Sequence, residues 1–373
     1  MSIASVRLGD VATFVRGITF KPADVLEEAS PTAVGCMRTK NVQVELDDTD
    51  VWYLPENFVT NKAKFLQKGD LLVSTANSWN LVGKACWVPE LPYACTFGGF
   101  ISVLRAKDSR LDKRYLYHWF TSKQIQQTLR SFGNKTTNIS NLSTKRAYEL
   151  SIPLPPLAEQ KRIAAILDKA EDIRRKREQV IEKLDQLAQS TFVEMFVTNE
   201  SSEAVTRPVK EICEFKYGKS LPASKREPGA YNVYGSNGIV GTHTTHLSSG
   251  ETIVIGRKGS YGEITYSKQA CYPIDTTFYV DSTATEQNIL WLSFALGTLK
   301  LNTMNKSAAV PGLSREDVYR QTLKVPKSNS QVDFEMKINA IDSLKSRAKS
   351  QLEQINIAFL SLQHQAFTTG FGT

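Results

Sequence analysis

The chain has 373 residues, of which 41% are hydrophobic and 23% are charged. This composition excludes an intrinsically disordered chain and provides enough length for two or three domains with their own cores. No stretch approaches the ~20 apolar residues that span a bilayer, the N-terminus lacks the apolar core of a signal peptide, and the five cysteines are scattered without a C-x-x-C pair. We therefore expect a cytoplasmic protein with reduced thiols and no membrane partner.

The net charge of +8 is concentrated in two separate parts of the sequence. Residues 1–150 contain 19 Lys and Arg against 14 Asp and Glu, and residues 201–330 contain 15 against 11. The segments between and after them are close to neutral. Two basic blocks suggest two contacts with a polyanion such as DNA.

The second half of the chain repeats the first. Four segments return in the same order: 8–20 as 209–221, 68–75 as 249–256, 133–155 as 304–326, and 160–196 as 335–371. This alignment places Phe14 over Phe215 and Tyr148 over Tyr319, and it matches Ile166 with Ile341. Ordered internal repeats indicate a duplicated architecture.

Each copy is predicted to contain a mixed α/β block. Short alternating runs bounded by turn residues predict strands at 70–74, 99–104, 251–256 and 277–280. Apolar residues at three- and four-residue spacing predict one helix at the end of each block, over 113–132 and 288–304.

Two long helices are predicted after the blocks. In the first, the stripe with alternating steps of three and four comprises Ile163, Ile166, Ala170, Ile173, Arg177, Val180, Leu184 and Leu187. In the second, it comprises Ile338, Ile341, Lys345, Ala348, Leu352, Ile355, Phe359 and Leu362. Such a stripe is typical of a coiled-coil seam, and a helix of this length would be a rod of roughly 55 Å. We expect the two helices to pair with each other antiparallel about a pseudo-twofold axis.

The segment 153–160 separates the first block from its helix. Pro153, Pro155 and Pro156 favour an extended approach, and Glu159 then lies in the first helical turn, where an acid favours the helix dipole. The basic run 174–177 has acidic neighbours one turn away, which favours a salt-bridged helix surface. The predicted domains are therefore residues 1–152, the hinge and helix 153–200, residues 201–327, and the second helix 328–373.

Catalytic motifs are missing from the sequence. The run "YGKS" at 217–220 lacks the preceding glycine of a phosphate-binding loop, and no methyltransferase motif occurs. His243 and His246 have no evident third ligand, and His118 and His364 have no nucleophile paired with them. We predict no catalytic residue and no metal site.

The segment "LPPLAEQKRIAAILDKAEDIRRKREQVIEKLDQLAQSTFVEMF" at 154–196 strongly resembles the conserved region of the specificity subunits of type I restriction–modification systems. That family alternates target-recognition domains with conserved helices, which is the order of the repeat. The second copy, "VPKSNSQVDFEMKI", departs from the pattern by losing P-P-L and the Glu-Gln pair. We therefore expect the two helices to offer unequal docking faces.

The resemblance implies a non-catalytic subunit that binds a bipartite, asymmetric target in double-stranded DNA. It implies two methyltransferase (modification) subunits docked on the helices, and restriction/translocase subunits added to that core. S-adenosylmethionine, ATP and magnesium would belong to these partners, so no cofactor is expected in this chain. The residues predicted to serve docking and spacing are Pro155, Pro156, Glu159, Gln160, Ile163, Ile166, Ile173, Leu184, Leu187, Ile341, Leu352, Ile355 and Leu362.

Residues that contact DNA are predicted from polar, glycine-flanked loops, because forked polar side chains read base edges and cations grip phosphates. In the second block these are Arg257, Lys258, Ser260 and Tyr261, with Tyr234 and Asn237 in a further loop. In the first block they are Asn77, Ser78, Asn80 and Lys84, with Arg38 and Lys40 as a further possibility. Each is equally readable as a turn residue, and Trp79 is expected in the core. Asn134, Lys135, Asn305 and Lys306 precede the hinges and are read as loop structure.

Two other functions stay open from the sequence. One is a protein-interaction scaffold whose two blocks bind proteins around a coiled-coil spacer. The other is an enzyme that acts on nucleic acid by itself, which the missing motifs oppose.

Overall fold

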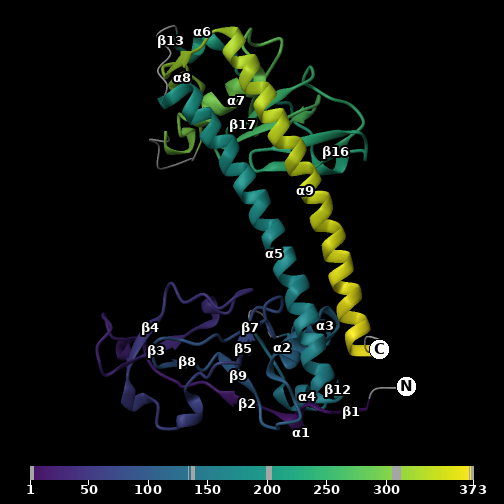
Figure 1. Cartoon of the computed structure of the whole chain (residues 1–373). Coiled ribbons are helices and arrows are strands. Elements are labelled where there is room, and N and C mark those ends of the chain that lie inside the picture. The colour runs from purple at the N-terminus through teal and green to yellow at the C-terminus, as the bar shows by residue number, and fades with distance from the viewer. Residues whose placement is uncertain are drawn as a thin grey trace. The chain divides into compact units, whose positions relative to one another are not determined.

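The computed structural model describes residues 4–132, 134–135, 139–198, 204–304, 312–368 and 370, with the backbone alone at 134–135. The chain divides into two compact units (Figure 1). Unit 1 comprises residues 1–177 and 351–373, and unit 2 comprises residues 178–350. The division falls inside both long helices, so each unit contains one globular block and one part of each helix. In the described part of the chain, no helix combines the length and apolar character needed to cross a membrane.

Unit 1 is built on a four-stranded antiparallel sheet of order β2-β9-β5-β7. Its strands are β2 (Ala12–Arg16), β5 (Leu71–Ser74), β7 (Ala85–Trp87) and β9 (Ile101–Ala106). A second sheet of order β4-β3-β8 contains β3 (Ala33–Met37), β4 (Trp52–Pro55) and β8 (Cys95–Phe97), with β3 and β8 parallel. The smaller pairings are β1 (Ser5–Arg7) with β12 (Ser151–Pro153), and β10 (Asn134–Lys135) with β11 (Ser140–Asn141) and β6 (Ala76–Asn77).

Unit 2 repeats this topology. Its four-stranded sheet has the order β14-β20-β17-β18, made of β14 (Lys216–Tyr217), β17 (Thr252–Gly256), β18 (Ile264–Ser267) and β20 (Thr277–Asp281). The sheet β16-β15-β19 contains β15 (Tyr231–Gly235), β16 (Gly238–His243) and β19 (Tyr272–Pro273), again with one parallel pair. The edge pairing is β13 (Val205–Pro208) with β21 (Thr322–Val325). The predicted internal repeat is therefore confirmed, as are the four predicted strands.

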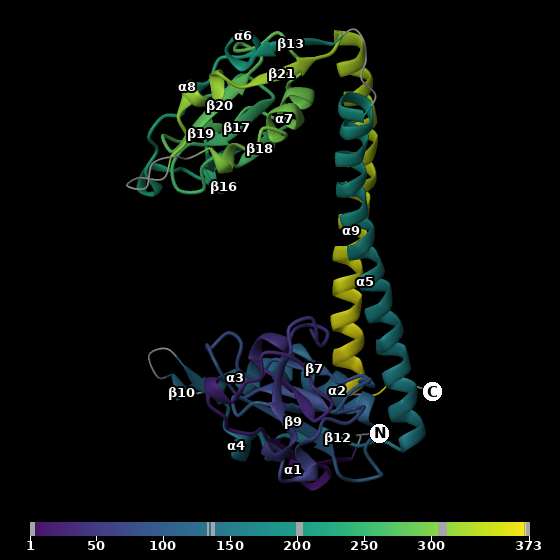
Figure 2. The ribbon, with the colours of Figure 1, turned by 90° about the vertical axis from the view of Figure 1, so that its left-hand side faces the viewer.

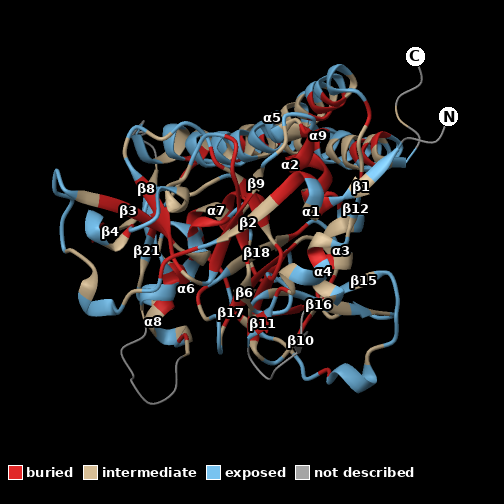
Figure 3. Cartoon of the chain, turned by 90° about the horizontal axis from the view of Figure 1, so that it is seen from below, coloured by how far each residue is buried: buried red, intermediate tan, exposed pale blue. Residues whose placement is uncertain are grey.

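Short helices cover these sheets. They are α1 (Leu8–Val11), α2 (Lys113–Thr121), α3 (Lys123–Ser131) and α4 (Thr144–Tyr148) in unit 1, and α6 (Val209–Ile212), α7 (Ile289–Gly297) and α8 (Arg315–Tyr319) in unit 2. In unit 2, α7 lies along β17 and β18 (Figure 2). Much of these strands is red in Figure 3, because many of their residues are buried.

The two helices predicted at the ends of the blocks are shorter than expected. The single helix predicted over 113–132 is wrong, because α2 ends at Thr121 and α3 starts at Lys123, after a break at Ser122. Ser122 adopts an extended conformation, and its hydroxyl donates to the carbonyl of Trp119 at 2.7 Å, which competes with the helical hydrogen-bond pattern. The second helix ends at Gly297, and a short 3₁₀ turn at Leu301–Thr303 follows.

Near the end of each block, a tyrosine hydroxyl accepts a hydrogen bond from a backbone N–H near the start of the block. The backbone N–H of Phe14 donates to the hydroxyl of Tyr148 at 2.7 Å, and that of Phe215 donates to Tyr319 at 2.8 Å. Both pairs also make edge-to-face ring contacts, with centroids 5.4 and 5.6 Å apart. The aligned Phe and Tyr of the sequence thus make the same contact in both copies, which connects α4 to β2 in unit 1 and α8 to the residue before β14 in unit 2.

Glycine is required at the same place in both copies. A Cβ on Gly17 would lie 2.2 Å from the carbonyl oxygen of Gly98, and one on Gly218 would lie 2.1 Å from that of Ile274. The chain that leaves β2 or β14 therefore passes directly against the backbone that follows β8 or β19.

The five cysteines are buried free thiols, as expected. Burial raises the pKa of Cys36, Cys86, Cys95 and Cys213 to about 12, so these thiols stay protonated near neutral pH.

The long helices are α5 (Leu157–Val193) and α9 (Ser328–Thr368), and a π-helical turn at Glu194–Thr198 follows α5. In unit 1, the start of α5 packs with the end of α9, and the Arg174 guanidinium lies 5.2 Å from the Phe359 ring centroid. In unit 2, the end of α5 packs with the start of α9, where the Phe192 and Phe334 ring centroids are 5.5 Å apart. Within each unit the two helices therefore run antiparallel.

The predicted seam is confirmed in α9 and half wrong in α5. Ile338, Ile341, Ala348 and Phe359 are buried, and Lys345 forms an ion pair with Asp185 of α5. In α5, however, Ile173, Val180 and Leu187 are 45%, 39% and 48% exposed. The inward positions lie one residue later, at Leu167, Arg174, Ile181 and Ala188, beside the shared row Ile163, Ala170, Arg177 and Leu184. Sequence hydrophobicity favoured the more apolar of two adjacent rows, whereas in the structure the less exposed row is the one that contains Arg174.

The predicted alignment of the two long helices is wrong by four residues. Gln160 and Gln331 are each the fourth residue of their helix and are 0% and 2% exposed. They differ by 171 positions, as do Tyr148 and Tyr319, whereas the sequence alignment placed Glu335 opposite Gln160. A shift of four residues still superposes half of the positions of a 3–4 stripe, so the apolar pattern alone does not exclude the wrong alignment. The second copy has therefore lost the glutamate but kept the glutamine.

Candidate nucleic-acid interface

The predicted basic loop of unit 2, Gly256–Gly262, is a tight turn that follows β17. Gly256 donates its N–H to Glu263, and Gly262 donates to Gly256, so the loop is closed at its base. Gly259 and Gly262 have φ values of +71° and +78°, and a Cβ on Gly256 would lie 2.2 Å from the carbonyl oxygen of Ser260. The glycines therefore build the turn.

The side chains of this loop divide into two kinds. Lys258 and Ser260 are exposed and carry groups suited to phosphate and base edges. Arg257 instead lies over two rings, 5.0 Å from the centroid of Tyr217 and 5.6 Å from that of Phe278. Arg315 of α8 lies 5.3 Å from the same Tyr217 ring. Tyr217 and Arg315 were not predicted as site residues, because the run "YGKS" at 217–220 indicates at most an incomplete phosphate-binding motif.

A second predicted loop of unit 2, the turn between β15 and β16, lies beside the first. The carbonyl of Thr276 accepts from the Ser236 hydroxyl at 2.7 Å and from the backbone N–H groups of Arg257 and Lys258 at 2.9 and 3.2 Å. Asn237 at the tip of the turn is exposed. Tyr234 is 5% exposed and packs with Val254 and Cys271, so it supports the turn from inside.

In both units, the loop after the third strand in the order of the four-stranded sheet (β5 or β17) is hydrogen-bonded to the segment that precedes the last short helix (α4 or α8). In unit 2, the N–H of Leu313 donates to Arg257 at 2.9 Å, and Lys258 forms a β-bridge with Gly312. In unit 1, the N–H of Leu142 donates to Thr75 at 2.8 Å, and β6 pairs with β11. Asn305 and Lys306 lie outside the described residues. Asn134 and Lys135 form β10, a strand rather than the expected irregular loop.

The predicted loop of unit 1 at 75–84 is held by its own polar groups. The Asn77 side chain donates to the Ser74 hydroxyl at 3.1 Å and accepts from the N–H of Ser78 at 2.8 Å, whereas Ser78 and Asn80 are exposed. Trp79, expected in the core, is 44% exposed. Lys84 donates to the Gln43 carboxamide at 2.7 Å, and Gln43 donates to the carbonyl of Lys40 at 2.6 Å. The structure thus connects Lys84 with the other predicted loop of this unit.

Arg38 and Lys40 are partly neutralised within the loop. Arg38 donates to an Asp50 carboxylate oxygen at 2.8 Å and lies 3.9 Å from the Trp52 ring centroid, and Lys40 pairs with the other Asp50 oxygen. The hydrogen bond from Lys40, followed by the charge of Arg38, lowers the pKa of Asp50, which is exposed. Two cations therefore share one carboxylate at this surface.

A cavity of about 520 Å³ in unit 1 was not predicted. Four cations line it, Lys84, Lys123, Arg130 and Arg174, against the single carboxylate of Glu171. Nε of Arg130 is buried and has no hydrogen-bond partner in the described part of the chain. The signal in the sequence is the spacing of Lys123 and Arg130, which are seven residues apart and hence on one face of α3.

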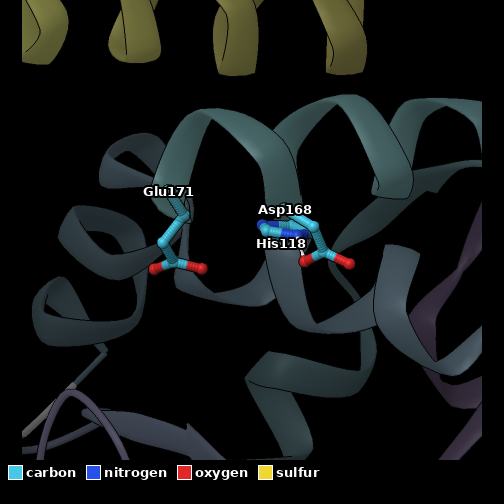
Figure 4. A group of neighbouring side chains, drawn as sticks. All are labelled: His118, Asp168 and Glu171. Atoms are coloured by element: carbon cyan, nitrogen blue, oxygen red, sulfur yellow. Dashed lines mark hydrogen bonds and ion pairs between the residues drawn. The ribbon is translucent and has the colours of Figure 1, made fainter. Parts of the chain in front are cut away.

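Beside this cavity, His118, Asp168 and Glu171 form a charged cluster that joins α2 to α5 (Figure 4). Asp168 makes hydrogen bonds with His118 Nε2 at 2.7 Å and Arg114 Nε at 2.6 Å. Burial alone would raise the pKa of Asp168, but these hydrogen bonds outweigh it and lower the pKa. The three donor atoms are close enough to hold a metal ion, but guanidinium groups already lie within 4 Å of both carboxylates. The arrangement therefore fits an interhelical link better than a metal site.

The hinge and the surface of α5 match several expectations. Pro155 is buried and Pro156 exposed, and Glu159 pairs with Arg162 at 2.7 Å. Within the basic run, Arg175 and Lys176 pair with Asp172, so the predicted salt-bridged surface is confirmed. Of the remaining predicted spacer residues, Ile163 is buried, Ile166, Leu184, Leu352, Ile355 and Leu362 are half-buried, and Ile341 is 8% exposed.

Comparisons with known proteins agree with this architecture. The chain is 31% identical over 159 residues to the type I restriction enzyme EcoKI specificity subunit of Escherichia coli K12, a match that covers 42% of this chain and 34% of that protein. It is 30% identical over 166 residues to the StySPI specificity subunit of Salmonella potsdam, covering 44% and 35%. These matches span about a third of the length of each relative. A putative MjaX specificity subunit of Methanocaldococcus jannaschii is 22% identical over 85% of this chain and 83% of its own.

Two solved structures have the same fold. The S subunit of a type I restriction–modification system from M. genitalium superposes with a TM-score of 0.62 at 18% identity, covering 98% of this chain and 96% of the other. A chain from a structural study of the assembly and conformational transition of the type I system gives 0.60 at 15% identity, covering 99% and 98%. The family model for the type I restriction modification DNA specificity domain matches residues 3–183 and again residues 201–356. This double match covers most of both copies of the repeat, and the chain belongs to the type I restriction–modification DNA specificity family.

Proposed function

We propose that this chain is the non-catalytic DNA-recognition subunit of a type I restriction–modification complex, with each block reading one part of a split target. The observation that carries the proposal is the repeated topology, in which each unit joins its polar strand-end loop to the segment before its last short helix. A single block of this kind could read one short sequence. Two such blocks on one chain suit a bipartite target, and the differences between their loops suit an asymmetric one.

The loop chemistry supports DNA as the ligand. Lys258 and Ser260 in unit 2, and Ser78 and Asn80 in unit 1, are exposed on turns fixed by backbone hydrogen bonds. Exposed Lys and backbone amides suit phosphates, while Ser and Asn suit base edges. The aromatic and basic group of Tyr217, Arg257 and Arg315 adds positive charge on a rigid base. Arg38, Lys40 and Lys84 would contribute mainly to phosphate contacts, since Asp50 and Gln43 already hold them.

The exposed apolar residues of α5 support docking of a partner helix. Ile173, Val180 and Leu187 recur every seven residues and leave 39–48% of their surface exposed. An apolar row at heptad spacing on a helix surface is suited to a further helix. We assign this row to a modification subunit, with a second modification subunit on α9. The exposed apolar residues of α9 (Val332, Met336, Leu344, Ile357 and Leu360) have no such regular spacing, which favours unequal docking faces.

Catalysis and cofactors are assigned to the partners. In this proposal the modification subunits hold S-adenosylmethionine, and the restriction/translocase subunits hold ATP and magnesium. The whole complex would act in the cytoplasm, where its DNA lies and where free buried thiols are stable.

The test uses the full chain in complex with its modification subunit. Duplex binding is measured over a range of salt concentrations for the wild type, for Lys258→Ala, and for the control Lys210→Ala on the exposed surface of α6. Loss of one phosphate contact should weaken binding and reduce the salt slope by about one. The control should leave both unchanged. Salt-independent binding of the wild type, or equal effects of the two variants, would contradict the proposal.

A further inference from the structure

Each long helix begins with a buried glutamine that is bonded to its own block. Gln160 and Gln331 are the fourth residues of α5 and α9, and five residues before each stands a proline, Pro155 or Pro326. Both side chains are almost fully buried, at 0% and 2% exposure. A buried carboxamide at the same position of both copies requires partners for its donors and its acceptor.

In unit 1 these partners are all backbone groups. Gln160 Nε2 donates to the carbonyl of Pro155 at 2.8 Å and to that of Arg110 at 2.7 Å. Its Oε1 accepts from the N–H of Asp112 at 2.8 Å. Asp112 is the N-cap of α2, and its carboxylate accepts from Arg114 and Tyr115. One side chain thus joins the proline hinge, the start of α5 and the start of α2.

Unit 2 contains the same arrangement with different residues. Gln331 Nε2 donates to the carbonyl of Pro326 at 3.1 Å and to Gln287 Oε1 at 2.8 Å. Its Oε1 accepts from the N–H of Asn288 at 2.9 Å, and Asn288 is the N-cap of α7. The second copy lost Pro-Pro-Leu and the glutamate of the motif, but its glutamine still makes three hydrogen bonds in the same pattern, with the Gln287 side chain in place of a backbone carbonyl.

Other polar contacts also join each block to its helix: Asp168 bonds His118 and Arg114 in unit 1, and the Asn288 side chain donates to Glu335 in unit 2. The carboxylates of these contacts are partly exposed, whereas both glutamines are almost fully buried. The remaining contacts are mostly apolar, such as those of Ile163 and Leu167 in unit 1 and of Phe334 and Ile338 in unit 2. Apolar packing is non-directional and tolerates small rotations. Three hydrogen bonds on a planar carboxamide do not, because rotation of the block about its helix would leave buried polar groups unpaired.

We propose that Gln160 and Gln331 are positioning residues that fix the orientation of each recognition block on the helix that follows it, and so determine which gap between the two half-sites the chain accepts. This rests on the proposed function, since a gap has meaning only for two DNA-reading blocks. Gln160 and Gln331 act through the blocks and do not contact DNA themselves.

The experiment measures gap discrimination by the full complex with its modification subunit. Duplexes carry both half-sites with the natural gap, or with one base pair more or fewer, and a second set carries a mismatch within one half-site. The variants are Gln160→Met and Gln331→Met, which keep length and burial but remove the hydrogen bonds. Gln160→Glu is the isosteric second variant, since it replaces the donating NH₂ by an oxygen facing two carbonyls. Gln186→Met, at an exposed position of α5, is the control.

Each Met variant removes three buried hydrogen bonds, and the loss of a single one costs up to about tenfold. We therefore expect the affinity preference for the natural gap to fall by at least about tenfold in each junction variant, with half-site discrimination unchanged. The control should behave as the wild type. If the variants weaken binding to all duplexes equally, the glutamines serve stability alone and the inference is overturned while the proposed function stands. If the wild type shows no gap preference, the proposed function itself fails.

Discussion

The exposed row on α5 gives a direct test of partner docking. We consider the triple variant Ile173→Gln, Val180→Gln and Leu187→Gln. Glutamine is a good helix former, so these changes should not weaken α5 itself. The three side chains are also largely outside the packed cores, so the stability of the free chain should change little.

The magnitude follows from the surface that stays exposed in the free chain. Full burial of a Val, Leu or Ile side chain contributes about 1.5–3 kcal/mol. Since 39–48% of each of these residues is still exposed, docking can gain roughly 1 kcal/mol at each position. The triple variant should therefore lose about 3 kcal/mol of binding free energy, or on the order of 100-fold in affinity for the modification subunit.

The assay is calorimetric titration of the chain with its modification subunit, with the thermal midpoint of each free variant measured alongside. The matched control is Gln186→Ala, which alters an exposed polar residue of the same helix. A loss of affinity smaller than about threefold in the triple variant, with an unchanged midpoint, would refute docking on this row. A large drop in the midpoint would show that the row is part of the internal seam after all.

Three further outcomes are expected. Tyr148→Phe and Tyr319→Phe each remove one hydrogen bond to a backbone N–H and should cost about 1 kcal/mol in their own unit, read as faster amide exchange of the aligned phenylalanine; unchanged exchange would contradict this. Burial raises the pKa of Asp281, but its hydrogen bonds, led by that from Lys216, lower it overall, so its stabilising effect is present above pH ~4 and lost as the pH falls further. An acid-unfolding titration should therefore show a shallower acid limb for Asp281→Asn than for the wild type. Exchange of residues 1–150 for the equivalent block of another family member should change one half of the modified target, and a change in both halves would disprove two independent readers.

Much of the fold could be predicted because the sequence contains an internal repeat. Short β-strands such as 251–256 have clear turn residues at both ends, and their copies at aligned positions support each other. The break at Ser122 was missed because an apolar 3–4 spacing continues through it, while the determinant is one hydroxyl bonding back to Trp119. The spacing of apolar residues does not show where a side-chain hydrogen bond competes with the hydrogen bonds of the helix.

The candidate interface was predicted less completely than the fold. Glycine spacing located the turn Gly256–Gly262, but it could not show that Arg257 lies over Tyr217, since these residues are forty positions apart. Tyr234 was predicted to contact DNA from a polar-aromatic loop, yet it lies in a run of three buried residues of β15 and packs with Val254 and Cys271. Exposure of a loop can be read from sequence, whereas the direction of each side chain depends on distant strands.

The two errors in the long helices have one physical origin. A heptad stripe specifies a spacing, but it does not by itself fix which of two adjacent rows faces inward or how two copies align, because a shift of four residues still superposes half of its positions. Buried polar groups remove this ambiguity, since each must meet particular partners. Gln160 and Gln331 do so at the starts of α5 and α9. The apolar row at Ile173, Val180 and Leu187 is then not needed for packing between α5 and α9. An apolar row that stays exposed on a helix is a reason to look for a further helix from a partner.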